Sequence, residues 1–77
     1  MRLLIVEDEK KLCDTVAKRL YGAGYEVDTC YDGDEALDYI FAEKYDLIVL
    51  DLNLPGMDGM DILRELREKN EETKVLI

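Results

Sequence analysis

Histidine is absent from this 77-residue sequence, and cysteine is scarce. The two cysteines, Cys13 and Cys30, lack CxxC spacing, and no histidine is present to complete a metal-ligand set. We therefore expect buried or half-buried free thiols, with a disulfide as the alternative that the sequence neither places nor excludes. Such cysteine usage fits a reducing cytoplasm best.

Long hydrophobic runs are also missing at the N-terminus. The segment MRLLIVEDEKK contains only four consecutive apolar residues before its charges begin. This run is too short for a signal peptide or a membrane-spanning helix. We therefore expect a cytoplasmic protein that does not engage a membrane.

Positive charge is scarce as well. Lysine and arginine number 10 against 19 aspartates and glutamates, which gives a net charge of −9. An acidic surface repels the phosphates of duplex DNA, so direct binding of nucleic acid by this chain is not expected. A hydrophobic content of 48% nevertheless excludes a disordered acidic tail, and 77 residues suffice for one small domain at most.

Four short segments are typical of strands. Residues 3–6 and 47–50 are continuously apolar, as expected of strands that are covered on both faces of a parallel sheet. Residues 25–30 alternate between apolar and polar side chains, which indicates a more exposed edge strand. Residues 74–77 begin another apolar strand.

Three segments with helical periodicity lie between these strands. We expect helices over residues 9–22, after the capping-box pair Asp32 and Glu35, and from Asp58 or Gly59 onward. The apolar stripes expected to face the core are Leu12, Val16 and Leu20, then Ala36, Leu37, Ile40 and Phe41, then Ile62, Leu63 and Leu66. The order βαβαβαβ with short connections predicts an α/β fold, a doubly wound parallel sheet with right-handed crossovers.

Both fully apolar strands are followed by acidic residues. Glu7 and Asp8 come after residues 3–6, and Asp51 comes after residues 47–50. The carboxyl ends of parallel strands form the ligand crevice of an open sheet, so these side chains should gather on one rim. Adjacent strands lie about 4.8 Å apart, and carboxylates that close raise each other's pKa unless a cation intervenes. Mg²⁺, which takes carboxylate and water oxygens and also binds phosphate, suits this rim.

The loop after Asp51 supports a cation site. Leu54 precedes a proline and is restricted to extended conformations, and Pro55-Gly56 suits the central positions of a type II turn. The turn would hold the backbone just past Asp51, so that the Asn53 carbonyl could complete the site. Asp58 has the simpler explanation of capping the third helix.

Two roles are open for Asp51. A strand-terminal acid can simply solubilise a turn. Beside Mg²⁺, a carboxylate can instead attack phosphorus and form an acyl phosphate, while the metal neutralises charge on the transferring group. The grouping of three acids with an asparagine and a Pro-Gly turn favours the second role.

The segments LLIVEDE, DGDEAL, YDLIVLDLNLPGMDG and ILRELR resemble the receiver domains of two-component response regulators, of the kind usually fused to a winged-helix DNA-binding domain. The resemblance implies a flavodoxin-like fold with strand order 2-1-3-4, and a signalling module that at most catalyses its own phosphorylation and dephosphorylation. It implies that Asp51 accepts a phosphoryl group from a sensor histidine kinase. It also implies that Asp8 and Asp51 bind Mg²⁺ directly, Asn53 through its main-chain oxygen and Glu7 through water.

Other features of that family are missing from residues 1–77. Receiver domains continue with a Ser or Thr that senses the phosphoryl group, a fifth strand that ends in a Lys, and two further helices. No DNA-binding domain is included either. We therefore expect a partial receiver domain over residues 1–77, truncated after the start of the fourth strand, with impaired switching.

The missing last helix also predicts self-association. Apolar strand surface would be exposed beside the KVLI edge, and such surface drives assembly into a dimer or a domain-swapped oligomer. A structural half-fold without phosphotransfer activity is therefore an open alternative. A phosphatase with an aspartate nucleophile is disfavoured, because that class places a general acid two residues on, where Asn53 stands here.

Overall fold

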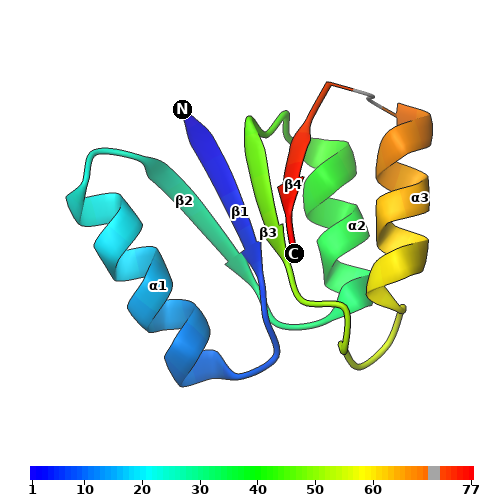
Figure 1. Cartoon of the computed structure of the whole chain (residues 1–77), viewed down its shortest axis with the longest axis horizontal. Coiled ribbons are helices and arrows are strands. Elements are labelled where there is room, and N and C mark those ends of the chain that lie inside the picture. The colour runs from blue at the N-terminus through cyan, green and yellow to red at the C-terminus, as the bar shows by residue number, and fades with distance from the viewer. Residues whose placement is uncertain (70–71) are drawn as a thin grey trace.

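The computed structural model describes residues 1–69 and 72–77, and the elements alternate between strand and helix along the chain (Figure 1). In order they are β1 (Arg2–Val6), α1 (Lys10–Gly22), β2 (Glu26–Cys30), α2 (Gly33–Ala42), β3 (Leu47–Leu50), α3 (Gly59–Lys69) and β4 (Lys74–Leu76). Each predicted element is confirmed, with ends within about two residues of those expected from the sequence pattern.

The strands form one parallel sheet in the order β2-β1-β3-β4. Central Ile5 pairs with Thr29 of β2 on one side and with Val49 of β3 on the other. Helix α1 lies on one face of the sheet, and α2 and α3 lie on the opposite face (Figure 1). This arrangement confirms the predicted doubly wound, flavodoxin-like topology, with β2 as an edge strand.

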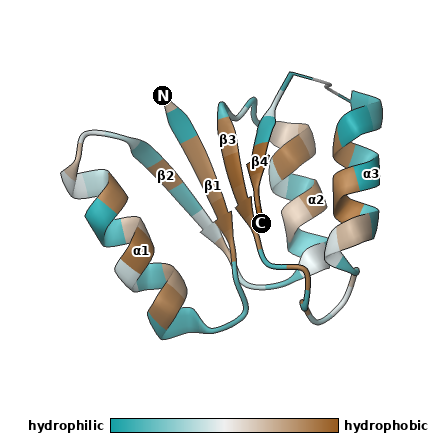
Figure 2. Ribbon diagram, in the orientation of Figure 1, coloured by the Kyte–Doolittle hydropathy of each residue, from teal (hydrophilic) through white to brown (hydrophobic). Residues whose placement is uncertain are grey.

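The main core lies between the sheet and the pair α2 and α3. Strand side chains alternate between faces, and Leu4, Val6, Ile48 and Leu50 point to this side. They pack against buried residues of the two helices, namely Ala36, Ile40, Ile62 and Leu66. In Figure 2 the central strands β1 and β3 are hydrophobic over most of their length, whereas hydrophobic and hydrophilic residues alternate along the helices.

Aspartate side chains cap two of the helices. Asp32 accepts a hydrogen bond from the Glu35 N–H at 2.8 Å, which satisfies a free donor in the first turn of α2. Asp58 accepts one from the Met60 N–H at 2.8 Å at the start of α3. The predicted capping roles of both residues are confirmed.

Two residues of the predicted apolar stripes lie on the surface instead. Leu12 is 46% exposed because α1 is rotated so that Cys13 takes the buried position against the sheet. Phe41 is 56% exposed because α2 has already buried Ile40, and the ammonium group of Lys69 lies 5.6 Å from the centre of its ring. The prediction that Leu12 and Phe41 face the core was wrong.

Both cysteines are buried free thiols, so the disulfide alternative is excluded in this structure. The Cys30 thiol donates to the Asp32 carbonyl at 3.1 Å. Burial raises the pKa of Cys30 to about 11. Burial also raises the pKa of Cys13, so neither thiol has the character of a reactive nucleophile.

No helix in the described part of the chain combines the length and the apolar character that crossing a membrane requires.

Candidate functional site

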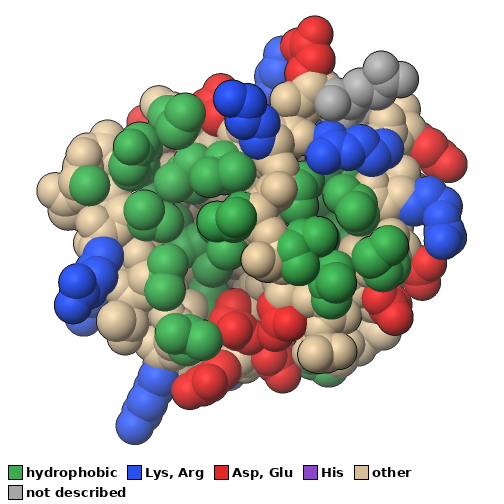
Figure 3. All heavy atoms as spheres, in the orientation of Figure 1, with side chains coloured by type: hydrophobic (Ala, Val, Ile, Leu, Met, Phe, Trp, Pro, Cys, Tyr) green, Lys and Arg blue, Asp and Glu red, His purple; other side chains and the backbone are tan. Residues whose placement is uncertain are grey.

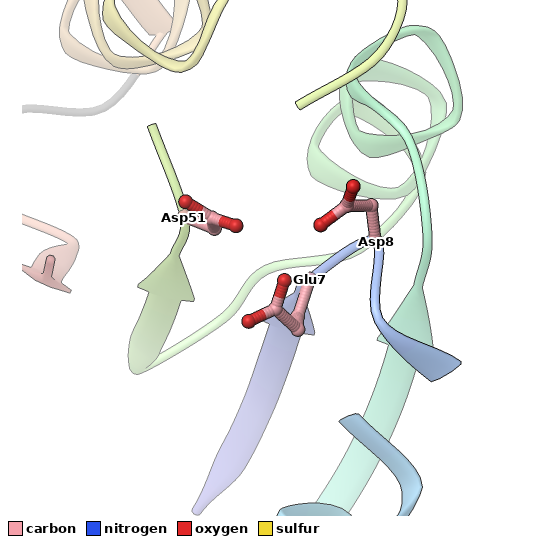
Figure 4. A group of neighbouring side chains, drawn as sticks. All are labelled: Glu7, Asp8 and Asp51. Carbon is pink, nitrogen blue, oxygen red and sulfur yellow. The ribbon is translucent and has the colours of Figure 1, made fainter. Parts of the chain in front are cut away.

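Three acidic side chains meet at the carboxyl ends of β1 and β3. Figure 4 shows Glu7 and Asp8 just after β1, turned toward Asp51 just after β3. Each offers a carboxylate oxygen, and these oxygens all lie within 4.8 Å of one another. The structure therefore brings together the three acids that the strand ends predict to share one rim.

Backbone hydrogen bonds continue the sheet for one residue past the strands and set this proximity. The Asp51 N–H donates to the Val6 carbonyl at 3.0 Å, and the Glu7 N–H donates to the Cys30 carbonyl at 3.0 Å. The two acids thus leave neighbouring strands at the same level of the sheet. Their positions follow from the parallel register and not from a flexible loop.

Burial and the crowding of the three acids change the pKa of Glu7. Its pKa is raised above the ordinary value, first by partial burial and then by hydrogen bonding with Asp51 and repulsion from that carboxylate. The Glu9 N–H, which donates to Glu7 Oε2 at 3.4 Å, acts in the opposite direction and lowers the pKa. A proton or a cation at this rim therefore relieves real repulsion.

The donor set fits a hard divalent cation. Two ligands on opposite sides of one Mg²⁺ lie about 4.2 Å apart, since each bond is about 2.1 Å long. The observed limit of 4.8 Å exceeds this by an amount that small side-chain rotations close, or that one bridging water spans. Glu7 and Asp51 are half-buried and Asp8 is exposed, so solvent reaches the cluster and an ion can enter.

The loop after Asp51 is tightly organised. The Asn53 N–H donates to Asp51 Oδ1 at 3.0 Å and so orients the carboxylate. Gly56 has φ of 76°, as the predicted type II turn requires at its third residue. The Asn53 side chain is exposed, and a metal-binding role for its main-chain carbonyl stays a prediction.

Two glycines pack against this loop, Gly33, which the sequence pattern did not single out, and Gly59, which it marked only as a possible helix start. A Cβ on Gly59 would lie 2.9 Å from the Asp51 carbonyl oxygen and 2.6 Å from the Leu52 Cα. A Cβ on Gly33 would collide with the backbone of Met57. A signal was present, because Asp-Gly occurs at 32–33 and again at 58–59, each time as a capping residue followed by the first residue of a helix.

Comparison with known protein families gives one match over almost the whole chain. The sequence profile of the response regulator receiver domain matches residues 3–77. Among curated proteins, the transcriptional regulatory protein DltR of Streptococcus agalactiae is 43% identical over 76 residues, which are 99% of this chain and 34% of DltR. The chain thus spans about a third of the length of this relative.

Solved structures show the same similarity. The response regulator TrrA of Thermotoga maritima, in complex with Mg²⁺-BeF, is 38% identical with a TM-score of 0.89, and the match covers 96% of this chain and 64% of that one. TrrA in complex with the histidine kinase ThkA matches with 38% identity, a TM-score of 0.87 and the same coverage of both chains.

Proposed function

Because this chain belongs to the family of response regulator receiver domains, we propose that it is the phosphoacceptor module of a two-component signalling system. A sensor histidine kinase would donate the phosphoryl group, and Asp51 would accept it. The observation that carries this proposal is the convergence of Glu7, Asp8 and Asp51 at the carboxyl edge of the sheet. The complex of TrrA with a histidine kinase supports the class of partner.

The proposed chemistry is a direct displacement at phosphorus. A carboxylate oxygen of Asp51 forms a bond to phosphorus, and the phosphorus–nitrogen bond of the kinase phosphohistidine breaks. The electron pair of that bond stays on the imidazole nitrogen, and the product is an acyl phosphate on Asp51. The protein contributes mainly by position, because the strand end and the Asn53 N–H hold the carboxylate in place before the donor arrives.

Mg²⁺ is the proposed cofactor. Asp8 and Asp51 would bind it directly, Asn53 through its main-chain oxygen and Glu7 through a water. When bound, the ion supplies positive charge that offsets the negative charge of the transferring group. The carboxylate geometry supports the roles of Glu7, Asp8 and Asp51, and the Mg²⁺-BeF complex of the related TrrA supports the choice of ion.

We propose further that the parent protein is a cytoplasmic transcriptional regulator of the winged-helix type, in which residues 1–77 serve as part of the receiver. The description of DltR as a transcriptional regulatory protein supports this role. The chain itself would turn over no separate substrate. Asn53 stands where an aspartate phosphatase carries its general acid, and an amide cannot donate that proton.

Phosphorylation by a small donor tests the proposal. We expect incubation with acetyl phosphate and Mg²⁺ to add the mass of one phosphate to the parent chain, measured by intact mass spectrometry. Asp51→Asn should gain nothing, and a chelator should abolish the gain. Asp38→Asn is the matched control, because Asp38 is an exposed acid on α2 away from the cluster. Equal labelling of the parent and Asp51→Asn would contradict the proposal.

Partly exposed apolar side chains on β3 and β4 favour a second candidate, a self-associating half-fold without phosphotransfer. Helix α1 packs against β1 and β2, and the β3 and β4 part of that face carries half-buried Leu47 and Val49. Leu76 and Ile77 beside them are 58% and 67% exposed. Figure 3 shows hydrophobic side chains spread across the centre of the molecular face that it presents.

Under this second candidate, two copies pair through β4 or exchange elements, because an apolar face beside an open strand edge favours burial against a second copy. Sedimentation and light scattering should then show a dimer or a larger species. Leu76→Lys should shift the distribution toward monomer, whereas Leu12→Lys on exposed α1 should have a smaller effect. A monodisperse parent monomer would refute self-association.

A further inference from the structure

The first turn of α2 lies directly against the loop that follows Asp51. The Gly33 N–H donates to the Pro55 carbonyl at 3.1 Å. One residue on, the Asp34 side chain lies so close to Gly56 that a Cβ on Gly56 would be 2.7 Å from Asp34 Oδ2. The loop connects β3 to α3, but it packs against a third element, the start of α2.

The contact between the loop and α2 leaves no room for a side chain at position 33. A Cβ on Gly33 would lie 2.8 Å from the Met57 carbonyl carbon and 2.9 Å from the Met57 nitrogen, and closer still to the Met57 carbonyl oxygen. These are backbone atoms, so no rotamer change relieves the collision. Either the loop or the start of α2 must move.

A shift of the loop would displace the acidic site, because only a few residues separate the two. Pro55, which accepts from Gly33, lies two residues after Asn53, and the Asn53 N–H holds Asp51 Oδ1 at 3.0 Å. The other end of the loop is held by the Asp58 cap and by the close approach of Gly59 to Leu52. Displacement at Met57 is therefore expected to act on the loop between these anchors, residues 53–57, which includes Asn53.

We propose that Gly33 is a positioning residue for the cation site, because its lack of a side chain lets the Pro55–Met57 backbone sit where Asn53 and Asp51 are correctly placed. This inference rests on the proposed function, since it concerns how that same site is held. Gly33 itself is not one of the proposed ligands of the ion.

A pair of glycine substitutions tests the proposal. Gly33→Ala introduces the collision, whereas Gly22→Ala at the end of α1 adds the same methyl group with no atom within 4 Å. Circular dichroism would first confirm that each variant is folded, and calorimetric titration would then measure the dissociation constant of Mg²⁺. We expect Gly33→Ala to bind Mg²⁺ about 10-fold more weakly or worse, as for residues that support metal ligands, and Gly22→Ala to match the parent.

The outcomes separate the two proposals. A parent chain that binds no Mg²⁺ and gains no phosphate would overturn the proposed function. A parent that binds Mg²⁺ with the same dissociation constant as Gly33→Ala would overturn the positioning role alone. If Gly33 were needed only for folding, Gly33→Ala would be less stable, but its folded molecules would bind Mg²⁺ with the parent affinity. That result would also overturn the positioning role.

A measurement on the parent chain covers the case in which Gly33→Ala does not fold. If loop position and ion binding are coupled, Mg²⁺ must in turn hold the loop on α2. Amide hydrogen exchange of Gly33, which donates to Pro55, should then slow several-fold when Mg²⁺ is added. The Ala23 amide, which donates to Arg19 and Leu20 at the end of α1, reports any general stabilisation. Equal slowing at Gly33 and Ala23 would overturn the proposal.

Discussion

Acidic side chains cluster at both ends of the sheet, but only those at the amino end are paired with an arginine and a tyrosine. At the amino end, the Arg2 guanidinium lies 3.1 Å from Asp28, 3.5 Å from Glu26 and 4.0 Å from Glu43. The Tyr45 hydroxyl donates to Asp28 at 2.6 Å. At the carboxyl end, three carboxylates have one another as close neighbours, with oxygens within 4.8 Å.

The difference shows in the protonation of each end. At the amino end, burial and the hydrogen bond to Asp28 raise the pKa of Tyr45, so the phenol stays protonated and keeps donating to Asp28. At the carboxyl end, burial and the neighbouring Asp51 raise the pKa of Glu7, so the charged form of this side chain is disfavoured. Acids that are paired stabilise a fold, whereas acids that are crowded and half-exposed are typical of a functional site.

Removal of Asp28 should give the largest loss of stability. Asp28→Ala leaves the Arg2 guanidinium and the buried Tyr45 hydroxyl without their shared acceptor. Because a hydrogen bond to a charged group is worth roughly 1.5–3 kcal/mol, we expect the free energy of unfolding to fall by about 2–3 kcal/mol. Urea denaturation followed by circular dichroism would measure it, with Asp38→Ala on exposed α2 as a control expected within about 0.5 kcal/mol. A smaller loss for Asp28→Ala than for Asp38→Ala would break the contrast.

Mg²⁺ should stabilise the carboxyl end by a similar amount. An ion that binds only the folded state at 100 times its dissociation constant raises the free energy of unfolding by about 2.7 kcal/mol. We expect this gain in the parent and its loss in Asp51→Asn, with NaCl at matched ionic strength as the comparison. Asp28→Ala should keep the gain despite its lower baseline. An equal effect of Mg²⁺ on Asp51→Asn and on the parent would place the ion elsewhere.

A pH dependence at Glu7 should be the smallest effect. Because its pKa is raised above the ordinary 4.5, the folded state binds this proton more tightly than the unfolded state. Without Mg²⁺, its contribution to stability is therefore fully present below pH 4.5 and is lost as pH rises through the raised pKa. Glu7→Gln should remove this part of the pH profile in denaturant titrations. Identical profiles for Glu7→Gln and the parent would show that the crowding has no energetic consequence.

Much of the fold could be predicted because its signals are local. The continuous apolar runs 3–6 and 47–50 become the two central strands, and the alternating run that ends at Cys30 becomes an edge strand. Asp32 and Asp58 begin helices because their carboxylates satisfy free N–H groups within two or three residues. Glu7, Asp8 and Asp51 share a rim because parallel strands place their carboxyl ends together.

The errors and omissions concern contacts between distant segments. Leu12 and Phe41 fit helical periodicity but are exposed, because the rotation of each helix depends on what it packs against. Arg2 carries no motif, and its role appears only when Asp28, 26 residues away, lies on the adjacent strand. Gly33 is an ordinary helix start in the sequence, and its close fit to Met57 exists only in the folded chain.

The sequence by itself determined the order of strands and helices, the parallel sheet and the delivery of Glu7, Asp8 and Asp51 to one edge. These follow from side-chain periodicity and from the direction of parallel strands, which act over a few residues. The tertiary structure alone decided which acids are paired with Arg2 and Tyr45 and which acids crowd one another. It did so because charges and backbone atoms interact through space, at distances that strand register and helix packing set.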